Sequence, residues 1–227
     1  MRRLFIGNKN YSSWSMRAWV LMRHFRIEFE EVMLRFDGFS PQSQFKQRLS
    51  EISPAGQVPV LVDDKLVVWD TLAISEYLAE TFPQRKLWPE NAAHRARARS
   101  VCAEMHGGFR ALRAACPMNI EAQLPDVGAL ALRDKPGVRE DLSRIVNMWS
   151  GLLTQHKGPM LFGEFSVADA YYCPVVMRLL TYQLPVPLDV KAYMERVTQL
   201  EAVKAWVEAA LLERDFLDFE EPYRLGR

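Results

Sequence analysis

The stretch NYSSWSMR, residues 10–17, stands where the sequence changes from a strand pattern to a helix pattern. Residues 4–7 before it indicate a short strand. Over residues 18–25 after it, apolar side chains recur at the i, i+3, i+4, i+7 spacing of a helix. A hydroxyl group in this stretch therefore lies near a helix N-terminus, where free N–H groups and the helix dipole favour an anion.

The serines of this stretch have two interpretations. A serine placed here can donate a hydrogen bond to a bound thiolate, which favours the thiolate over the thiol and lowers the pKa of the thiol. Alternatively, Ser12, Ser13 or Ser15 only caps the helix. The stretch taken alone favours the cap.

Four further segments complete the first part of the chain. Residues 29–34 indicate a strand, and the polar segment over residues 40–53 leaves its helical content open. Two β-rich runs, residues 58–62 and 66–69, are separated by a short turn and predict a hairpin. Residues 71–81 carry a helical stripe, so this part of the chain mixes strands and helices.

The chain changes character after this helix. Pro83 and Pro89 bracket a short segment that is typical of an interdomain linker. Beyond it the apolar stripes have helical spacing, and each stripe needs a partner, so a helical bundle is expected. The sequence thus predicts a first domain over residues 1–82, a linker over 83–91 and an all-helical domain over 92–227.

The composition argues against several classes of protein. The 29 basic and 28 acidic residues leave a formal net charge of +1, which gives no reason to expect a nucleic acid or an anionic membrane as partner. No apolar run approaches the ~20 residues that span a bilayer. Three widely spaced cysteines without a Cys/His cluster argue against a disulfide scaffold and a metal site, so a reducing cytoplasm is the expected setting.

A proline marks the start of the first strand of the expected hairpin. In SPAGQVPVL, residues 53–61, Pro59 cannot donate to a strand ladder and belongs at a strand start or at an edge. If the turn is cis, it aims the backbone of Val58 outward, where its N–H and C=O could pair with a peptide laid alongside. An ordinary strand-entry proline explains the stretch equally well.

Two later stretches lie where helices are expected to begin. In WDTLAI, residues 69–74, Asp70 and Thr71 either cap the helix or bind an amino-acid terminus, the acid pairing with its ammonium group and the threonine with its carboxylate. In GEFSVAD, residues 163–169, the serine and the aspartate have the spacing of a capping box. We assign this last stretch to folding and not to catalysis.

In their order and spacing, these four stretches resemble the glutathione transferase superfamily, and the resemblance spans most of the chain. Residues 12–17 are most similar to the serine-type classes, zeta and its bacterial relatives. The resemblance implies an α/β thioredoxin-like N-terminal domain, an all-α helical-bundle C-terminal domain and a homodimer.

The resemblance places Ser12 at the catalytic position, where its hydroxyl would bond to the sulfur of glutathione. Ser13 and Tyr11 are close enough that a slip of one residue in the alignment would exchange them for Ser12. The related classes that use a catalytic cysteine are disfavoured, because no cysteine lies in residues 1–82.

The resemblance also implies how glutathione is held. The backbone of Val58 would pair with the cysteinyl portion, with Gln57 beside it, and the Val58–Pro59 peptide bond is expected to be cis. Asp70 and Thr71 would hold the γ-glutamyl end, where the family more often has Glu-Ser. Lys46 is the candidate for the glycine carboxylate.

The expected activity joins glutathione to a small hydrophobic electrophile, by pKa lowering and proximity. The electrophile pocket is expected between the domains, lined by Tyr11, Trp14, Met105 and Phe109, with Met118 as a further candidate. For Met105 and Phe109, packing in the core is the competing interpretation.

Two other functions remain open. One is a glutathione-dependent isomerase similar to maleylacetoacetate isomerase, although the zeta pattern usually has a cysteine where this chain has Trp14. The other is a non-catalytic glutathione-binding or regulatory protein, because the fold alone does not establish catalysis.

Overall fold

The computed structural model describes residues 1–221, 223 and 224. The first third of the chain forms a four-stranded sheet in the order β2-β1-β3-β4, in which β1 and β2 are parallel and the other neighbours are antiparallel. The mixed sheet with its flanking helices is the thioredoxin-like arrangement that the sequence predicts. The elements of this part are β1 (Arg2–Ile6), α1 (Ser13–His24), β2 (Glu30–Met33), α2 (Gln44–Ser50), β3 (Val60–Asp63), β4 (Leu66–Trp69) and α3 (Thr71–Thr81).

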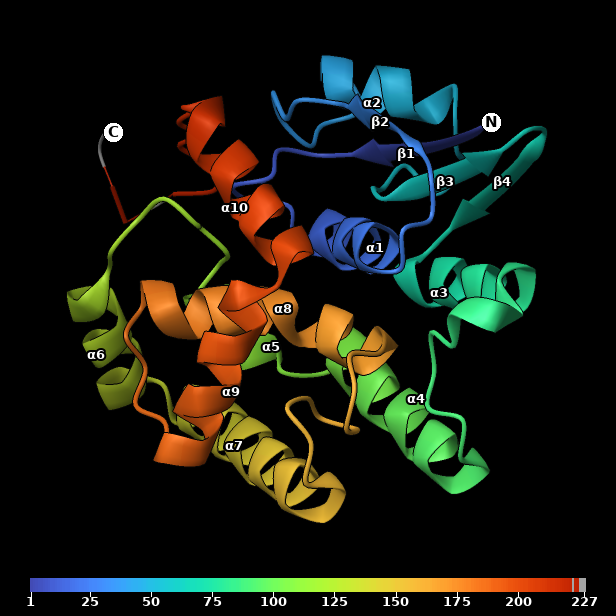
Figure 1. The fold of residues 1–227 in the computed structure, drawn as a ribbon. Coiled ribbons are helices and arrows are strands. Elements are labelled where there is room, and N and C mark those ends of the chain that lie inside the picture. Colours follow the sequence, from blue (N-terminus) through green and yellow to red (C-terminus); the bar gives the residue numbers. More distant parts are fainter. Residues whose placement is uncertain (222, 225–227) are drawn as a thin grey trace.

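The sheet has a different hydrophobic layer on each face. Successive side chains of a strand point to opposite faces, so Leu4 and Ile6 of β1 join the main core with α1 and α3, whereas Phe5 joins a second core. The second core includes Phe45 and Leu49 of α2. Figure 1 shows α2 on one side of the sheet and α1 and α3 on the other.

The observed elements agree closely with the sequence pattern. The hairpin begins two residues later than expected, at β3, because Pro59 has no N–H to donate to the ladder. The Val58–Pro59 peptide bond is cis, which confirms the prediction. The segment of open helical content forms α2, whose first turn is capped by the Ser43 hydroxyl, which accepts from the N–H of Lys46 at 3.2 Å.

The rest of the chain is helical, as predicted. At its centre lies α8, a helix buried on nearly all sides that packs against α1 of the first layer as well as α4 and α9 (Figure 1). Within the described residues, no helix combines the length and apolar character needed to cross a membrane. The elements are η1 (Pro83–Arg85), α4 (Ala92–Gly107), α5 (Arg110–Ala115), α6 (Pro125–Asp134), α7 (Pro136–His156), α8 (Val167–Thr181), α9 (Leu188–Gln199) and α10 (Glu201–Glu213).

A capping box starts the central helix and confirms the folding role assigned to residues 163–169. The Ser166 hydroxyl accepts from the N–H of Ala168 at 3.2 Å, and the carboxylate of Asp169 accepts from the N–H of Ser166 at 2.9 Å. The same carboxylate accepts from the N–H of Leu161 at 3.0 Å and from the hydroxyl of Tyr193 at 3.1 Å. Burial nevertheless raises the pKa of Asp169 to about 6.

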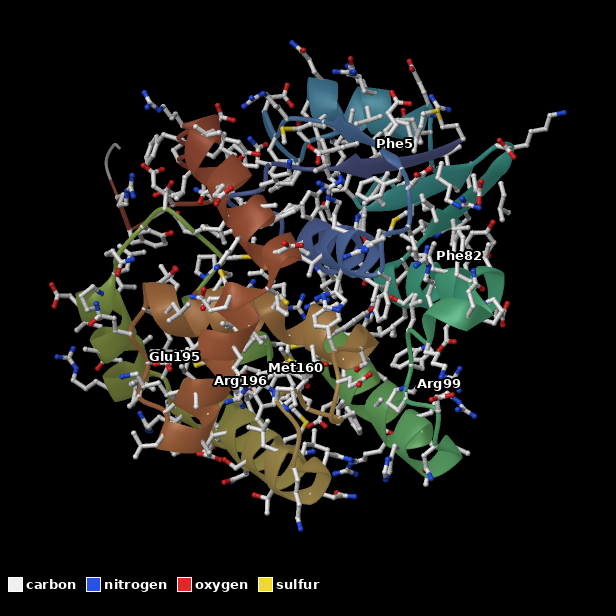
Figure 2. The ribbon with its side chains drawn as sticks, viewed as in Figure 1. Phe5, Phe82, Arg99, Met160, Glu195 and Arg196 are labelled. Carbon is white, nitrogen blue, oxygen red and sulfur yellow. The ribbon has the colours of Figure 1, made fainter. Side chains whose placement is uncertain are left out.

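The two halves of the chain are tied together at the linker and at the C-terminal tail. At the linker side, Arg99 of α4 forms a two-point ion pair with Glu76 of α3, and Figure 2 shows Phe82 and Arg99 on this side of the molecule. The tail after α10 returns to the first layer, where Asp215 pairs with Arg35. The tail thereby lies against the loop that precedes α1.

Candidate functional site

A cleft of about 910 Å³ lies between the sheet layer and the helical part. Its walls come from the loop before α1, the loop before β3, the start of α3 and the helices α4, α5 and α8. The cleft brings together eight of the ten residues predicted for the site: Tyr11, Ser12, Trp14, Lys46, Gln57, Val58, Asp70 and Thr71.

Ser12 occupies the N-cap position of α1, but its side chain makes no capping hydrogen bond. Its hydroxyl oxygen lies 2.7 Å from that of Ser15, which in turn accepts from the N–H of Gly7 at 3.1 Å. Ser12 is only 6% exposed and lines the cleft. The structure therefore does not support the interpretation of Ser12 as a side-chain cap.

The hydroxyl groups of Ser13 and Tyr11, the two neighbours that could exchange with Ser12, are already hydrogen-bonded to other residues. The hydroxyl of Ser13 accepts from the Arg178 guanidinium at 3.4 Å, on the helical side of the cleft. The hydroxyl of Tyr11 donates to the backbone carbonyl of Asp215 at 3.0 Å and to the carboxylate of Glu221. Burial and the bond to Glu221 raise the pKa of Tyr11, so this phenol is held neutral by the tail.

The loop before β3 is fixed by a lysine. Lys46 of α2 donates from its ammonium group to the carbonyl of Gly56 at 2.6 Å. Gly56 has a φ of +58°, a conformation that suits glycine. The ladder of β3 begins at Val60, so Val58 lies beyond it at the edge of the cleft. Gln57 is exposed beside it.

Asp70 is a helix cap and a cleft residue at the same time. One carboxylate oxygen accepts from the N–H of Leu72 at 3.0 Å, and the other lies 3.1 Å from Nε2 of His106. The Asp70 side chain is 45% exposed. Thr71 beside it is buried, and its hydroxyl accepts from the phenol of Tyr171 at 2.8 Å, which leaves the threonine proton available to a ligand.

Two of the predicted pocket residues lie outside the cleft, and this part of the prediction is corrected. Met105 and Phe109 are 1% and 6% exposed and belong to the main core, not to the cleft lining. The apolar stripe of α4 faces α8, which draws Met105 inward. Met118, in contrast, lines the cleft.

The charged residues of the helical side of the cleft were not predicted from the sequence. They are His106, Arg110, Arg113 and Arg178, together with the tail residue Glu220. Their helices were assigned by apolar stripes alone, and no local motif marks them. One signal was available, because Arg178 is the only charged residue in the largely apolar run of residues 170–180. A charged residue in a helix that is apolar all round is rarely buried without a partner or a function.

The cysteines take no part in the cleft. All three are buried and free, and burial raises the pKa of each thiol, to about 11 for Cys116. Among the residues that the structure describes, no group of three or more His, Cys, Asp or Glu side chains is placed to hold a metal ion. Among the described residues, the polar groups of the cleft are therefore hydroxyls, amides, carboxylates and cationic side chains.

Known proteins resemble this chain in both sequence and fold. The family model "Glutathione S-transferase, N-terminal domain" matches residues 11–81. A "Probable maleylacetoacetate isomerase" from Caenorhabditis elegans is 29% identical over 165 residues, covering 72% of each chain. A "Stringent starvation protein A homolog" from Histophilus somni is 28% identical over 160 residues, covering 68% of this chain and 69% of that one. A Burkholderia glutathione transferase homolog, solved with bound glutathione, has a TM-score of 0.69 at 21% identity, covering 94% of this chain and 99% of that one.

Proposed function

We propose that this chain, which belongs to the glutathione S-transferase superfamily, binds glutathione in the cleft, activates its thiol as a thiolate and transfers it to a small electrophile. This proposal rests on one observation: three segments that are far apart in the sequence line the same cleft. Ser12, Val58 and the Asp70–Thr71 pair offer a thiolate donor, a backbone edge and a site for an amino-acid terminus. A chain that used the fold only as a scaffold would not need all three.

The γ-glutamyl end of glutathione fits the start of α3. The carboxylate of Asp70 is accessible and can pair with the ammonium group of the ligand, although His106 already faces one of its oxygens. The hydroxyl of Thr71 can donate to the γ-glutamyl carboxylate while it continues to accept from Tyr171. The positive end of the helix dipole favours the same carboxylate.

The rest of the tripeptide fits the loop before β3. The free backbone edge at Val58 can pair with the cysteinyl residue, as in strand addition. The Lys46 ammonium group uses one of its three donors on Gly56, so two donors remain for the glycine carboxylate. Gln57, exposed at the edge, can add a side-chain contact.

A chain of donors can stabilise the thiolate. The N–H of Gly7 donates to the Ser15 hydroxyl, and a hydroxyl rotates freely between partners. When Ser15 donates to Ser12, the proton of Ser12 is free to bond to the sulfur. Such chains polarise one another, and the bond to a charged acceptor is the stronger one. The thiolate is thereby favoured over the thiol near neutral pH, and the sulfur attacks the electrophile.

A second candidate function is glutathione-dependent isomerisation, because maleylacetoacetate isomerases stand among the similar proteins. In that reaction the thiolate adds to a double bond, the bond rotates and glutathione leaves. The same donors serve both reactions until the adduct forms. The chain has Trp14 where a serine-type zeta sequence usually has a cysteine, which favours transfer over isomerisation.

A non-catalytic role is the third candidate, since stringent starvation protein A homologs are also similar to this chain.

We further propose a cytoplasmic homodimer, with residues 1–82 as the glutathione-binding domain and 92–227 as the helical domain. Exposed Leu66 on the edge strand β4 gives such a dimer apolar surface to bury. Sedimentation showing only a 26.2 kDa species would count against the dimer.

The test of the proposed function has two parts. Calorimetric titration with glutathione measures binding, and a panel of electrophiles measures conjugation against the uncatalysed rate. Binding with conjugation supports the transferase, and binding with conversion of a cis-enedione acid to its trans isomer supports the isomerase. Binding without turnover supports a non-catalytic glutathione-binding role, and absence of glutathione binding overturns the transferase and the isomerase and leaves only a regulatory role.

A further inference from the structure

The helical side of the cleft carries three arginines, Arg110, Arg113 and Arg178, which we call the arginine wall. They come from α5 and α8, so they face the first layer across the cleft. Nothing in the binding of glutathione described above uses them. Their arrangement indicates a second ligand group with the opposite charge.

Arg178 is the innermost member and is only 5% exposed. Its Nη1 donates to the carbonyl of Pro174 in its own helix at 3.3 Å, and its Nη2 reaches the hydroxyl of Ser13 at 3.4 Å. Its Nε has no partner among the residues that the structure describes. Burial, and after it the charge of Arg113, lower the pKa of Arg178 to about 10. A guanidinium group this buried and this poorly bonded is costly without an anion.

Arg113 is also partly buried and weakly hydrogen-bonded. Its guanidinium lies 5.0 Å from the ring of Trp14 and makes only long bonds, of 3.4 and 3.3 Å, to the carbonyls of His106 and Gly108. Burial and the charge of Arg110 lower the pKa of Arg113. On the same indole, at 4.0 Å, lies the guanidinium of Arg17. Two arginines of like charge therefore contact the same indole.

The acids of the cleft do not neutralise this wall. Only Asp70 and Glu220 contribute carboxylates among the lining residues that the structure describes. Asp70 caps α3 and faces His106. The charge of Glu220 acts on Arg178, and burial raises the pKa of Glu220 to about 7, so this acid is partly protonated near neutrality. The wall is left with excess positive charge.

Glutathione does not supply enough negative charge either. In the proposed complex its two carboxylates lie at Thr71 and Lys46, on the opposite wall. Its thiolate brings one charge, at Ser12. Three arginines facing one thiolate still leave positive charge to be matched, and guanidinium groups match a carboxylate in two-point geometry.

We propose that the arginine wall binds a carboxylate of the electrophile, held by Arg113 and Arg178, so that this enzyme selects anionic electrophiles with an apolar body. The proposal rests on the proposed glutathione transfer. The apolar body would lie against Trp14, Pro117 and Met118, which also line the cleft. Arg110, exposed at the rim, would attract the anion as it enters.

The chemical step leaves the arginines protonated throughout. For an unsaturated ketone, the thiolate sulfur forms a bond to the β-carbon, and the electron pair of the double bond moves to the carbonyl oxygen as an enolate. Water then supplies the proton that the α-carbon takes up. The carboxylate of the electrophile remains bound to the wall and orients the β-carbon toward the sulfur.

A matched pair of electrophiles tests the wall. Ethacrynic acid and its methyl ester share one unsaturated ketone and differ in a single negative charge. With rates divided by the uncatalysed rates, kcat/KM is expected to favour the acid by at least about tenfold, the worth of a charge-assisted bond. In Arg113→Gln this preference is expected to fall toward one.

Control variants separate the wall from charge and folding in general. Arg133→Gln removes an exposed arginine that pairs with Asp134 on α6, and the acid preference is expected to persist. Because Arg178 is buried, the substitution there is Arg178→Lys, which keeps the positive charge but removes the two-point geometry of the guanidinium group. Melting temperatures verify that each variant is folded. The affinities of the two glutathione conjugates, measured by calorimetry, give a readout that needs no turnover and should show the same preference.

Three results would overturn the proposal. Equal rates or affinities for acid and ester would remove the carboxylate site and leave glutathione transfer standing. A raised pKa of bound glutathione in Arg113→Gln, with an unchanged acid preference, would assign the arginines to the thiolate instead. Failure of glutathione itself to bind would show that the proposed function is wrong, and with it the inference drawn from it.

Discussion

The two walls of the cleft are built in different ways. The wall of the first layer, which we call the glutathione wall, uses Ser12, Lys46, Val58, Asp70 and Thr71 at loop ends and helix starts. The arginine wall uses long side chains from two helices, α5 and α8. The first is a set of short, locally fixed groups with nearly balanced charge, and the second is a cluster of like charges without matching acids. The first therefore suits one zwitterionic peptide, and the second selects by charge.

The largest expected effect is on the glutathione wall. Ser12→Ala should lower kcat about 100-fold or more, as loss of one preorganised donor does elsewhere, with little change in the affinity for glutathione. The reason is that Ser12 bonds most strongly to the sulfur after the proton has left. Steady-state kinetics with glutathione varied at a saturating electrophile separates kcat from KM. A large rise in the Kd of glutathione with kcat intact would show that Ser12 binds and does not activate.

The next effect sharpens the role of Asp70, which both caps α3 and faces the cleft. Asp70→Asn keeps a good capping side chain and removes the charge, so stability should hold while glutathione affinity falls roughly 10- to 100-fold. Asp70→Ala should lose the affinity and also about 1 kcal/mol of stability. Calorimetry and thermal melts on both variants measure the two losses. If Asp70→Asn binds like the parent, Asp70 is a cap alone.

The smallest expected effect concerns the arginine wall and pH. Burial raises the pKa of Glu220 from 4.5 to about 7, while Arg178 opposes the rise. As the pH rises through 7, Glu220 becomes charged and competes for Arg178, so the preference for acid over ester should fall a few-fold. Glu220→Gln should keep the preference constant over this range. A parent enzyme whose preference does not change with pH would contradict the link between Glu220 and Arg178.

The same group gives a stability prediction with a definite sign. Because the folded pKa of Glu220 lies above its ordinary value, the folded protein holds this proton more tightly than the unfolded chain. Its contribution to stability is therefore present below about pH 4.5 and is lost as the pH rises through about 7. Glu220→Gln should remove this part of the pH dependence, which urea unfolding at several pH values measures. An identical pH profile in parent and variant would show that Glu220 is solvated.

The difference between the walls also explains what the sequence could predict. Helix α3 and strand β4 agree with the expected ranges to the residue, because periodicity and turn residues determine them locally. The open segment that became α2 is capped from outside its own first turn, by the carboxylate of Asp37, which accepts from the N–H groups of Gln44 and Phe45. The residues of the glutathione wall could also be predicted from local sequence, since they lie in short motifs at the ends of helices and strands.

The arginine wall could not be predicted from local sequence motifs. Arg113 and Arg178 lie 65 residues apart on two helices and come together only in the folded cleft. The return of the C-terminal tail is equally non-local, because Tyr11 and Glu221 are 210 residues apart in sequence. Met105 and Phe109 show the reverse error, since a helical stripe does not indicate which of its members face a cleft.

The central claim, that Ser12 activates the thiol, is tested most directly by titrating the thiolate of bound glutathione. Its ultraviolet absorbance is followed against pH in the parent, in Ser12→Ala and in Ser13→Ala as the matched control. Only Ser12→Ala is expected to raise the pKa of the bound thiol, and raising the pH should partly restore the turnover of this variant. A shift in Ser13→Ala alone would move the role by one residue, and no shift in either variant would contradict the serine mechanism.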